Sequence, residues 1–362
     1  MFGDSDSCKT SVLTHLLLNN TLHIVGDTNN IYLGLDNLED KEFIKSSNAV
    51  MENFFKPEIP IPNNARSKPR NIFSQFPLFT YPTQGDRTLT LSVKDVNRKN
   101  TLQKIDFYDF SGNILHKQTA TKAERKEFEE ISRKVKEADV IVFTVDSVKC
   151  MEKLAYSDDA IFLLNALAEL EKSDPKHEKM IIIVPTKFEK YYHKFSRDLS
   201  YNENDYSTFN KLISNTRTML APLLDWLGDP TRRAHYEVSI LPVLTLGNID
   251  FFAYLSNYGT ELTLDLSGQQ YFQYYNRMLL NPDNEFDATK LPNYEPMYSE
   301  YPLSMILVYL FDKILSGKRK KLSQCPAFKN KQLSETMVTL KKSLETPVSH
   351  YPHTIVQSKL VK

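Results

Sequence analysis

The sequence predicts an α/β fold with a mainly parallel sheet and helices on both of its faces. Short, almost wholly apolar runs occur at residues 138–147, 179–185 and 235–246, as expected of strands that are buried on both faces. Amphipathic segments with apolar residues at helical spacing separate these runs. Strands that alternate with helices are typical of parallel sheets, because parallel neighbours need a crossover connection.

The other elements follow in chain order. Residues 88–96 and 101–110 alternate like two strands, and the polar turn between them predicts a hairpin. Helical patterns are found at residues 10–20, 117–138, 151–172, 205–227 and 301–315. Residues 41–86 are irregular and rich in Pro, Asn and Ser, and we expect a long insert there. Residues 248–300 are rich in Tyr and Asn and form an extra segment without a clear assignment.

Composition excludes several classes of protein. The 362 residues include 45 Lys or Arg and 45 Asp or Glu, so the basic excess of a chain-wide nucleic-acid binder is missing. No apolar run approaches the ~20 residues that cross a bilayer, and no secretory leader is recognisable. The three cysteines are scattered and suggest neither a disulfide framework nor a zinc site. We therefore expect a cytoplasmic protein without a transmembrane segment.

The neutral total conceals a basic C-terminal segment. Residues 317–362 contain ten Lys or Arg and two acidic residues, a net charge of +8, so the remainder of the chain carries −8. We expect one domain over residues 1–316, followed by a basic, partly disordered tail over 317–362. The alternative is that this tail contacts an acidic surface.

A phosphate-binding motif opens the chain. The residues from Gly3 to Thr10 match the loop G-x-x-x-x-G-K-[ST], except that Cys8 replaces the second glycine. In such a loop, backbone N–H groups and a helix N-terminus face phosphate oxygens. The expected nucleotide contacts are Gly3, Asp6, Ser7, Cys8, Lys9 and Thr10, with Lys9 also catalytic through its charge and Thr10 also a ligand of Mg²⁺. The alternative is a Ser-rich cap before an ordinary helix.

Two further segments suit a triphosphate and its metal. Asp109 ends a predicted strand and Gly112 follows three residues later, which fits a D-x-x-G arrangement. Asp109 would hold Mg²⁺ through water, and the Gly112 N–H would contact the γ-phosphate. Thr83 would reach Mg²⁺ and the γ-phosphate from the insert, with Thr80 and Thr88 as rivals.

A base-reading motif follows a later apolar strand. Thr186, Lys187 and Glu189 fit the pattern [NT]-K-x-D except for the longer acid, and Glu189 offers the same charge and acceptors as Asp. Thr245, after the next strand, would place a backbone N–H near guanine O6, with Ser239 as its rival.

These five segments occur in one order, each at the end of the expected element, and in this the chain resembles the P-loop GTPases of the Ras-like and translation-factor superclass. It is more loosely similar to large bacterial relatives with a long insert. The resemblance covers residues 1–247 and the helix at 301–316. It implies a P-loop NTPase-like three-layer α/β/α fold, bound GTP or GDP, and Mg²⁺ as cofactor.

The chain departs from that family in four ways. Only Met1 and Phe2 precede Gly3, so the strand that normally carries the phosphate loop is missing. We expect an incomplete amino terminus, with a fold that lacks its first strand as the alternative. Cys8 adds a side chain where the family has glycine, and Glu189 replaces Asp. Asn113 stands where many relatives place a water-orienting Gln, so we expect it to be a weak catalytic residue.

The leading hypothesis is a GTP-binding switch that hydrolyses the γ-phosphate slowly and acts through an unknown protein partner. The alternative is a degenerate G-domain that serves as a non-catalytic interaction module. A third hypothesis is an ATPase with a P-loop. No histidine pattern indicates a hydrolytic metal site.

Overall fold

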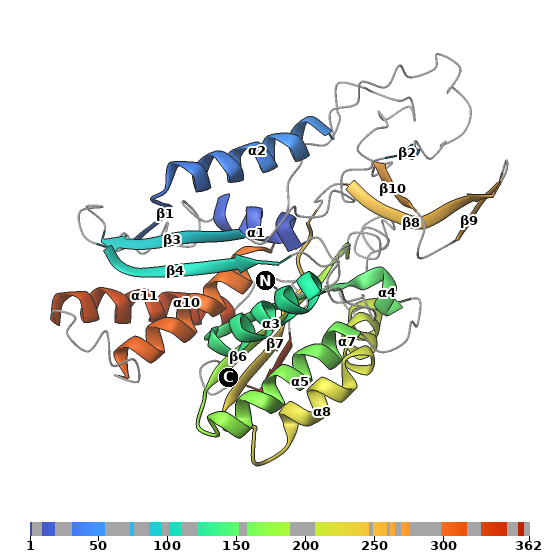
Figure 1. Cartoon of the computed structure of the whole chain (residues 1–362). Coiled ribbons are helices and arrows are strands. Elements are labelled where there is room, and N and C mark those ends of the chain that lie inside the picture. Colours follow the sequence, from blue (N-terminus) through green and yellow to red (C-terminus); the bar gives the residue numbers. More distant parts are fainter. Residues whose placement is uncertain are drawn as a thin grey trace.

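Helices and strands from all parts of the described chain are drawn in Figure 1, which shows the computed structural model. The described residues are 1, 9–18, 31–54, 73–75, 87–95, 101–110, 122–151, 158–188, 207–245, 249–258, 261–264, 269–274, 298–316, 327–345 and 354–357. Within these ranges, no helix has the length and apolar character needed to cross a membrane.

A sheet with three parallel strands forms the centre of the fold. It consists of β5 (Val140–Asp146), β6 (Lys179–Thr186) and β7 (Tyr236–Ile240), which pair in parallel in the order β7-β6-β5. Every residue of β6 and β7 is buried, which explains their almost continuous apolar sequence. The predicted α/β class is therefore confirmed in its coarse form, a mixed α/β structure with three parallel strands and surrounding helices.

The predicted hairpin forms a separate antiparallel sheet. The strands β3 (Arg87–Asp95) and β4 (Thr101–Asp109) pair with each other, and β1 (Ile31–Leu35) adds to β3, so the order is β1-β3-β4. The hairpin is confirmed, whereas β1 has too short an apolar run to be recognised from its pattern. Among the described strands, β4 lies at one edge of this sheet and β5 lies at one edge of the parallel sheet.

A third, antiparallel sheet takes three of its strands from the extra segment at 248–300. Its strands are β2 (Phe73–Gln75), β8 (Ile249–Tyr258), β9 (Glu261–Leu264) and β10 (Gln269–Tyr274), in the order β2-β10-β8-β9. Because β2 comes from the long insert, the two segments that the sequence left unassigned pair with each other.

Several helices match the predicted ranges. They are α1 (Lys9–Leu18), α3 (Lys122–Glu137), α5 (Asp158–Ser173), α7 (Ser207–Met219) and α10 (Glu300–Leu315). The predicted helix at 205–227 is interrupted, because Leu220 separates α7 from α8 (Ala221–Gly228) and Pro222 opens the second helix. Of the predicted helix at 151–172, the described residues place Met151 at the end of α4 (Ser147–Met151) and residues 158–172 in α5.

The start of the insert is helical, and the prediction of an irregular segment from residue 41 is wrong there. Residues 38–54, part of which we expected to be irregular, form the helix α2 (Leu38–Phe54). Its sequence contains many polar residues and only a narrow apolar stripe, with Ile44 buried. The helix packs on α1 and β1, so tertiary contacts rather than a strong local pattern specify it.

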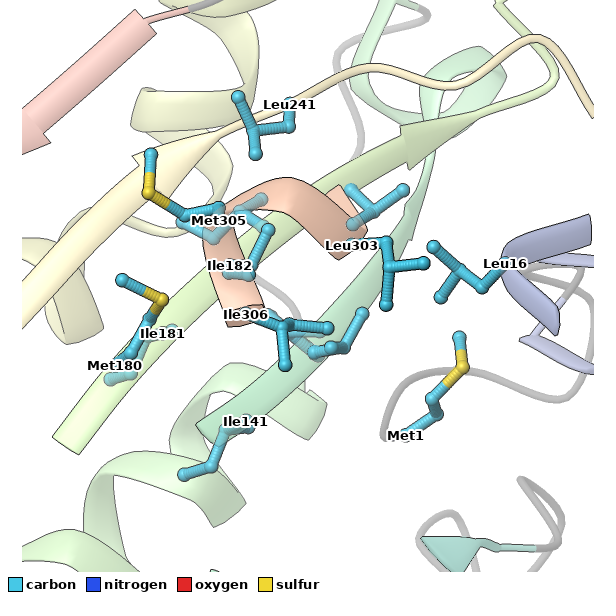
Figure 2. Packing of buried hydrophobic residues seen from close by; sticks show 14 of the residues in the cluster. Met1, Leu16, Ile141, Met180, Ile181, Ile182, Leu241, Leu303, Met305 and Ile306 are labelled. Atoms are coloured by element: carbon cyan, nitrogen blue, oxygen red, sulfur yellow. The ribbon is translucent and has the colours of Figure 1, made fainter. Parts of the chain in front are cut away.

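The core is centred on α10. All residues from Tyr301 to Phe311 are buried, as expected of a helix that is apolar on every side. Figure 2 shows Leu303, Met305 and Ile306 of α10 gathered near Ile181 and Ile182 of β6. On other sides α10 contacts α1 and α11 (Ala327–Glu345).

Two elements come from the basic C-terminal segment. The helix α11 packs along α10, and β11 (Thr354–Gln357) pairs antiparallel with β7 at the edge of the parallel sheet. The segment that we expect to be a tail therefore contributes a helix and a strand to the folded unit.

Candidate functional site

The first group of site residues lies where α1 begins. The helix is held in place by Val12, Leu13 and Leu16, which are fully buried on its apolar side. This packing fixes the position of its first residues, Lys9 and Thr10. The Lys9 side chain is only 4% exposed, so a cation is kept in the interior at a helix N-terminus. A buried cation in such a place needs an anionic neighbour.

An anionic group near the start of α1 comes from the end of β4. Asp109 is the last residue of this strand and is 1% exposed. The Thr10 hydroxyl donates a hydrogen bond to Asp109 Oδ2 over 2.9 Å, although the two residues are 99 positions apart. The structure therefore brings together the two residues that the sequence proposes, from separate motifs, as ligands of one metal ion.

The amino group of Met1 joins this group. It donates a hydrogen bond to the backbone oxygen of Tyr108, next to Asp109. Burial lowers the pKa of the Met1 amine from 8.0 to about 6; Asp109 opposes this shift and the positive charge of Lys9 adds to it. The Met1 amine, the Lys9 ammonium and the Asp109 carboxylate thus interact in a buried space at the start of α1.

A second group lies at the carboxyl ends of the parallel strands. Lys187 Nζ forms an ion pair with Asp146 Oδ2 at 2.8 Å, and both side chains are buried. The other oxygen of Asp146 accepts hydrogen bonds from the backbone N–H groups of Val148 and Lys149 at 2.8 and 3.2 Å, so the carboxylate also caps α4. Asp146 is therefore held from two directions.

Lys187 has an unusual backbone. Its φ angle is +55°, in the left-handed region that residues with a side chain seldom adopt. It directly follows the buried strand β6, and its side chain reaches Asp146 of the neighbouring strand. Strained positions of this kind are concentrated at functional sites, which makes this turn a candidate for ligand contact.

The strand register places the remaining candidates at the same edge. Asp146 and Thr186 are partners in the β5–β6 ladder, and the Thr186 hydroxyl donates to the oxygen of Val145 over 3.2 Å. Beyond β7 the chain continues along β6, since the N–H of Val243 donates to the oxygen of Pro185 over 3.0 Å. Thr245, which is fully buried, follows two residues later. Ligands of open α/β sheets bind at this carboxyl edge.

The predicted site residues thus fall into three sets. Lys9, Thr10 and Asp109 form the first group, and Thr186, Lys187 and Thr245 lie at the carboxyl edge of the parallel sheet. The others lie outside the described residues, namely Gly3, Asp6, Ser7, Cys8, Thr83, Gly112, Asn113 and Glu189.

Asp146 was not among the predicted site residues. The only signal in the sequence is an acidic residue at the carboxyl end of an apolar strand, and such a residue caps helices at least as often as it binds ligands. The Met1 amine was also missed, because its position depends on the tertiary fold.

The described residues offer no protein-only metal cage. Among them, no group of three or more His, Cys, Asp or Glu side chains could hold a metal ion. Thr10 and Asp109 supply two oxygens, which is the number that Mg²⁺ commonly takes from a protein when phosphates and water complete its shell. Hence the arrangement suits a metal ion that arrives with a phosphate ligand.

Comparisons with known proteins add no assignment. No family model, no curated protein and no solved structure matches this chain.

Proposed function

We propose that this chain is a P-loop NTPase-like protein that binds GTP and GDP with Mg²⁺ and hydrolyses GTP slowly, as a nucleotide-dependent switch. The observation that carries the proposal is the hydrogen bond between Thr10 and Asp109 beside the buried Lys9. These residues come from two motifs that were assigned independently to one nucleotide-bound metal.

Each described residue has a role in this proposal. Lys9 would neutralise charge on the terminal phosphates, and Thr10 and Asp109 would hold Mg²⁺, directly or through water. The bound metal would supply charge stabilisation at the transferring phosphate. Thr186 and Lys187 would form one wall of the base site, completed by Glu189 and Thr245.

The contact between Thr10 and Asp109 also explains how the site could be held ready. The Asp109 carboxylate accepts a hydrogen bond from the Thr10 hydroxyl, which keeps the oxygens of both side chains at one place. A metal ion that arrives with a phosphate would then find both oxygens already positioned. Such preorganisation reduces the cost of binding.

The test is a titration with fluorescent GTP, GDP and ATP, each with and without Mg²⁺. We expect GTP and GDP to bind more tightly than ATP, and GTP affinity to fall when Mg²⁺ is removed. Asp109→Asn should weaken Mg²⁺-dependent GTP binding by about 10–100-fold, a typical loss when a group that supports a metal is removed.

Asp106→Asn is the matched control. Asp106 lies on the same strand, is exposed, and accepts a hydrogen bond from the Thr90 hydroxyl over 2.8 Å. We expect this variant to bind GTP like the unmodified chain. Equal or absent binding of all three nucleotides would contradict the proposal. Tighter binding of ATP than of GTP would favour the third hypothesis, an ATPase with a P-loop.

One observation favours the alternative of a non-catalytic interaction module. Lys187 is fully buried and held by Asp146, whereas a base-reading lysine must offer its stem to a ligand. Cys8→Gly distinguishes the two hypotheses, because it restores the glycine of the phosphate loop. If GTP binds only to this variant, the natural chain is the interaction module.

A slow rate of hydrolysis is part of the proposal. Asn113 is shorter than the Gln that orients water in many relatives. Single-turnover release of phosphate from bound GTP should therefore be slow, and Asn113→Gln should accelerate it without changing GTP affinity. An unchanged rate would remove Asn113 from the catalytic residues.

A further inference from the structure

Three consecutive residues at the end of β6 are tied to the end of β5 or to the core. The Thr186 hydroxyl donates to the oxygen of Val145 over 3.2 Å, and Lys187 Nζ donates to Asp146 Oδ2 over 2.8 Å. Phe188 is fully buried in the hydrophobic core. These three residues, 186–188, form what we call the β6 turn. Because all three side chains are fixed in the interior, β5 and the core determine the path of the backbone in this turn.

Lys187 is the strained position of the β6 turn. A φ angle of +55° costs free energy for a residue with a side chain, and such a conformation persists only where surrounding contacts impose it. The buried ion pair with Asp146 is a contact of this kind, because it fixes the far end of the lysine side chain while β6 fixes the near end. The pair therefore helps to hold the turn in its left-handed conformation.

The Asp146 carboxylate is fixed by groups other than Lys187. Asp146 is the last residue of β5, and its register in the ladder places it opposite Thr186. Its Oδ1 accepts hydrogen bonds from the backbone N–H groups of Val148 and Lys149 at 2.8 and 3.2 Å. The strand and the first turn of α4 thus hold the carboxylate in one place, and it can serve as a fixed support for the lysine.

We propose that Asp146 is a positioning residue for base recognition: through Lys187 it holds the β6 turn in the conformation that distinguishes guanine from adenine. This inference rests on the proposed function, in which the β6 turn belongs to the base-reading motif. Asp146 itself does not contact the nucleotide. Specificity for guanine then depends on a buried ion pair behind the site as well as on the groups that face the ligand.

The burial of Lys187 agrees with the role of an anchor. The side chains of Lys187 and Asp146 are 0% and 1% exposed, and separation of the pair would leave two uncompensated charges in the interior. The pair therefore stays intact when a nucleotide binds. In this arrangement Lys187 contributes the position of the turn, so its lack of exposure is compatible with a site that reads the base.

The experiment measures the affinities of fluorescent GTP and ATP in the presence of Mg²⁺, with inorganic tripolyphosphate as a competitor. Tripolyphosphate has no base, so its affinity reports on the phosphate site alone. In Asp146→Asn we expect the preference for GTP over ATP to fall by about tenfold, which is typical of one lost hydrogen bond to a ligand. The affinity for tripolyphosphate should stay constant, whereas a general loss of structure would lower it.

Asp139→Asn is the matched control. Asp139 directly precedes β5, and its Oδ1 lies 3.6 Å from Lys313 Nζ. The control therefore removes a carboxylate that pairs with a lysine at the opposite end of the same strand. We expect Asp139→Asn to keep the guanine preference of the unmodified chain.

Lys187→Met provides a second test, because Asp146 acts on the turn through Lys187. We expect Lys187→Met to lose as much guanine preference as Asp146→Asn, and the double variant to lose no more than either single variant. If Asp146→Asn alone does not fold, Lys187→Met and the double variant still give this comparison, since the double variant removes both charges of the pair. A further loss of guanine preference from Lys187→Met to the double variant would overturn the proposal.

The results also separate this inference from the proposed function. If the unmodified chain does not prefer GTP over ATP, the proposed function fails and this inference fails with it. If the unmodified chain prefers GTP and Asp146→Asn prefers it equally, only this inference is overturned. Equal losses of affinity for GTP, ATP and tripolyphosphate in Asp146→Asn would also overturn it, because the ion pair would then support the fold alone.

Discussion

Replacing Lys187 with methionine should destabilise the fold strongly, because it leaves the Asp146 carboxylate in the interior without its cation. Both side chains of this ion pair are buried, and the Nζ–Oδ2 distance is 2.8 Å. Methionine keeps most of the stem, and its backbone cost at a φ of +55° is similar to that of lysine. The variant therefore removes the charge with little change in packing.

The magnitude follows from the burial of the pair. Removal of one partner of a buried ion pair costs about 3–5 kcal/mol, since the remaining charge is uncompensated. The backbone N–H groups of Val148 and Lys149 still hold Asp146 Oδ1, so we expect the lower part of this range. The double variant Lys187→Met, Asp146→Asn should be more stable than Lys187→Met alone, because it also removes the uncompensated charge of the Asp146 carboxylate.

The assay is urea unfolding followed by circular dichroism, with Lys136→Met as control. Lys136 pairs with Glu169 at 2.6 Å, but these side chains are 31% and 61% exposed. Exposed pairs contribute about 0.2–1 kcal/mol, so the control should unfold near the midpoint of the unmodified chain. A loss in Lys187→Met no larger than in the control would refute the reasoning.

Three further predictions concern buried titratable groups. Burial lowers the pKa of the Met1 amine from 8.0 to about 6, so stability from this group is complete above pH 8 and is lost as the pH falls through 6, up to about 3 kcal/mol. Acetylation of the amine should make the urea midpoint less dependent on pH between pH 6 and 8. An unchanged pH dependence of the midpoint would contradict the prediction. Burial also lowers the pKa of His15 from 6.5 to about 3, so its contribution is complete above pH 6.5 and declines as the pH falls toward 3. In His15→Leu, the urea midpoint should therefore fall less steeply as the pH decreases. An equally steep fall in this variant would argue against burial of a neutral imidazole. Burial raises the pKa of the Cys150 thiol to about 12, so iodoacetamide should label this cysteine only in urea. Labelling is followed by mass spectrometry of the peptide that contains Cys150. Rapid labelling of the native chain would contradict the prediction.

The parallel strands and the hairpin could be predicted because their patterns are local. The apolar runs of β5 and β6 leave few alternatives to a buried strand, and β3 and β4 alternate around a polar turn. The helix α2 could not be predicted in this way, because its apolar stripe is narrow and the helix is stabilised by α1 and β1. The sheet of β2, β8, β9 and β10 was missed since it joins segments almost 200 positions apart, such as Ser74 and Phe272.

The candidate site was predictable in part for a similar reason. Lys9 and Asp109 stand in motifs with characteristic spacing, so each could be proposed without knowledge of the fold. Asp146 has no such motif, and its role depends on the register that sets it beside Thr186. Only the structure shows that β4 and β5 border one cavity, because no local pattern relates two strands from different sheets.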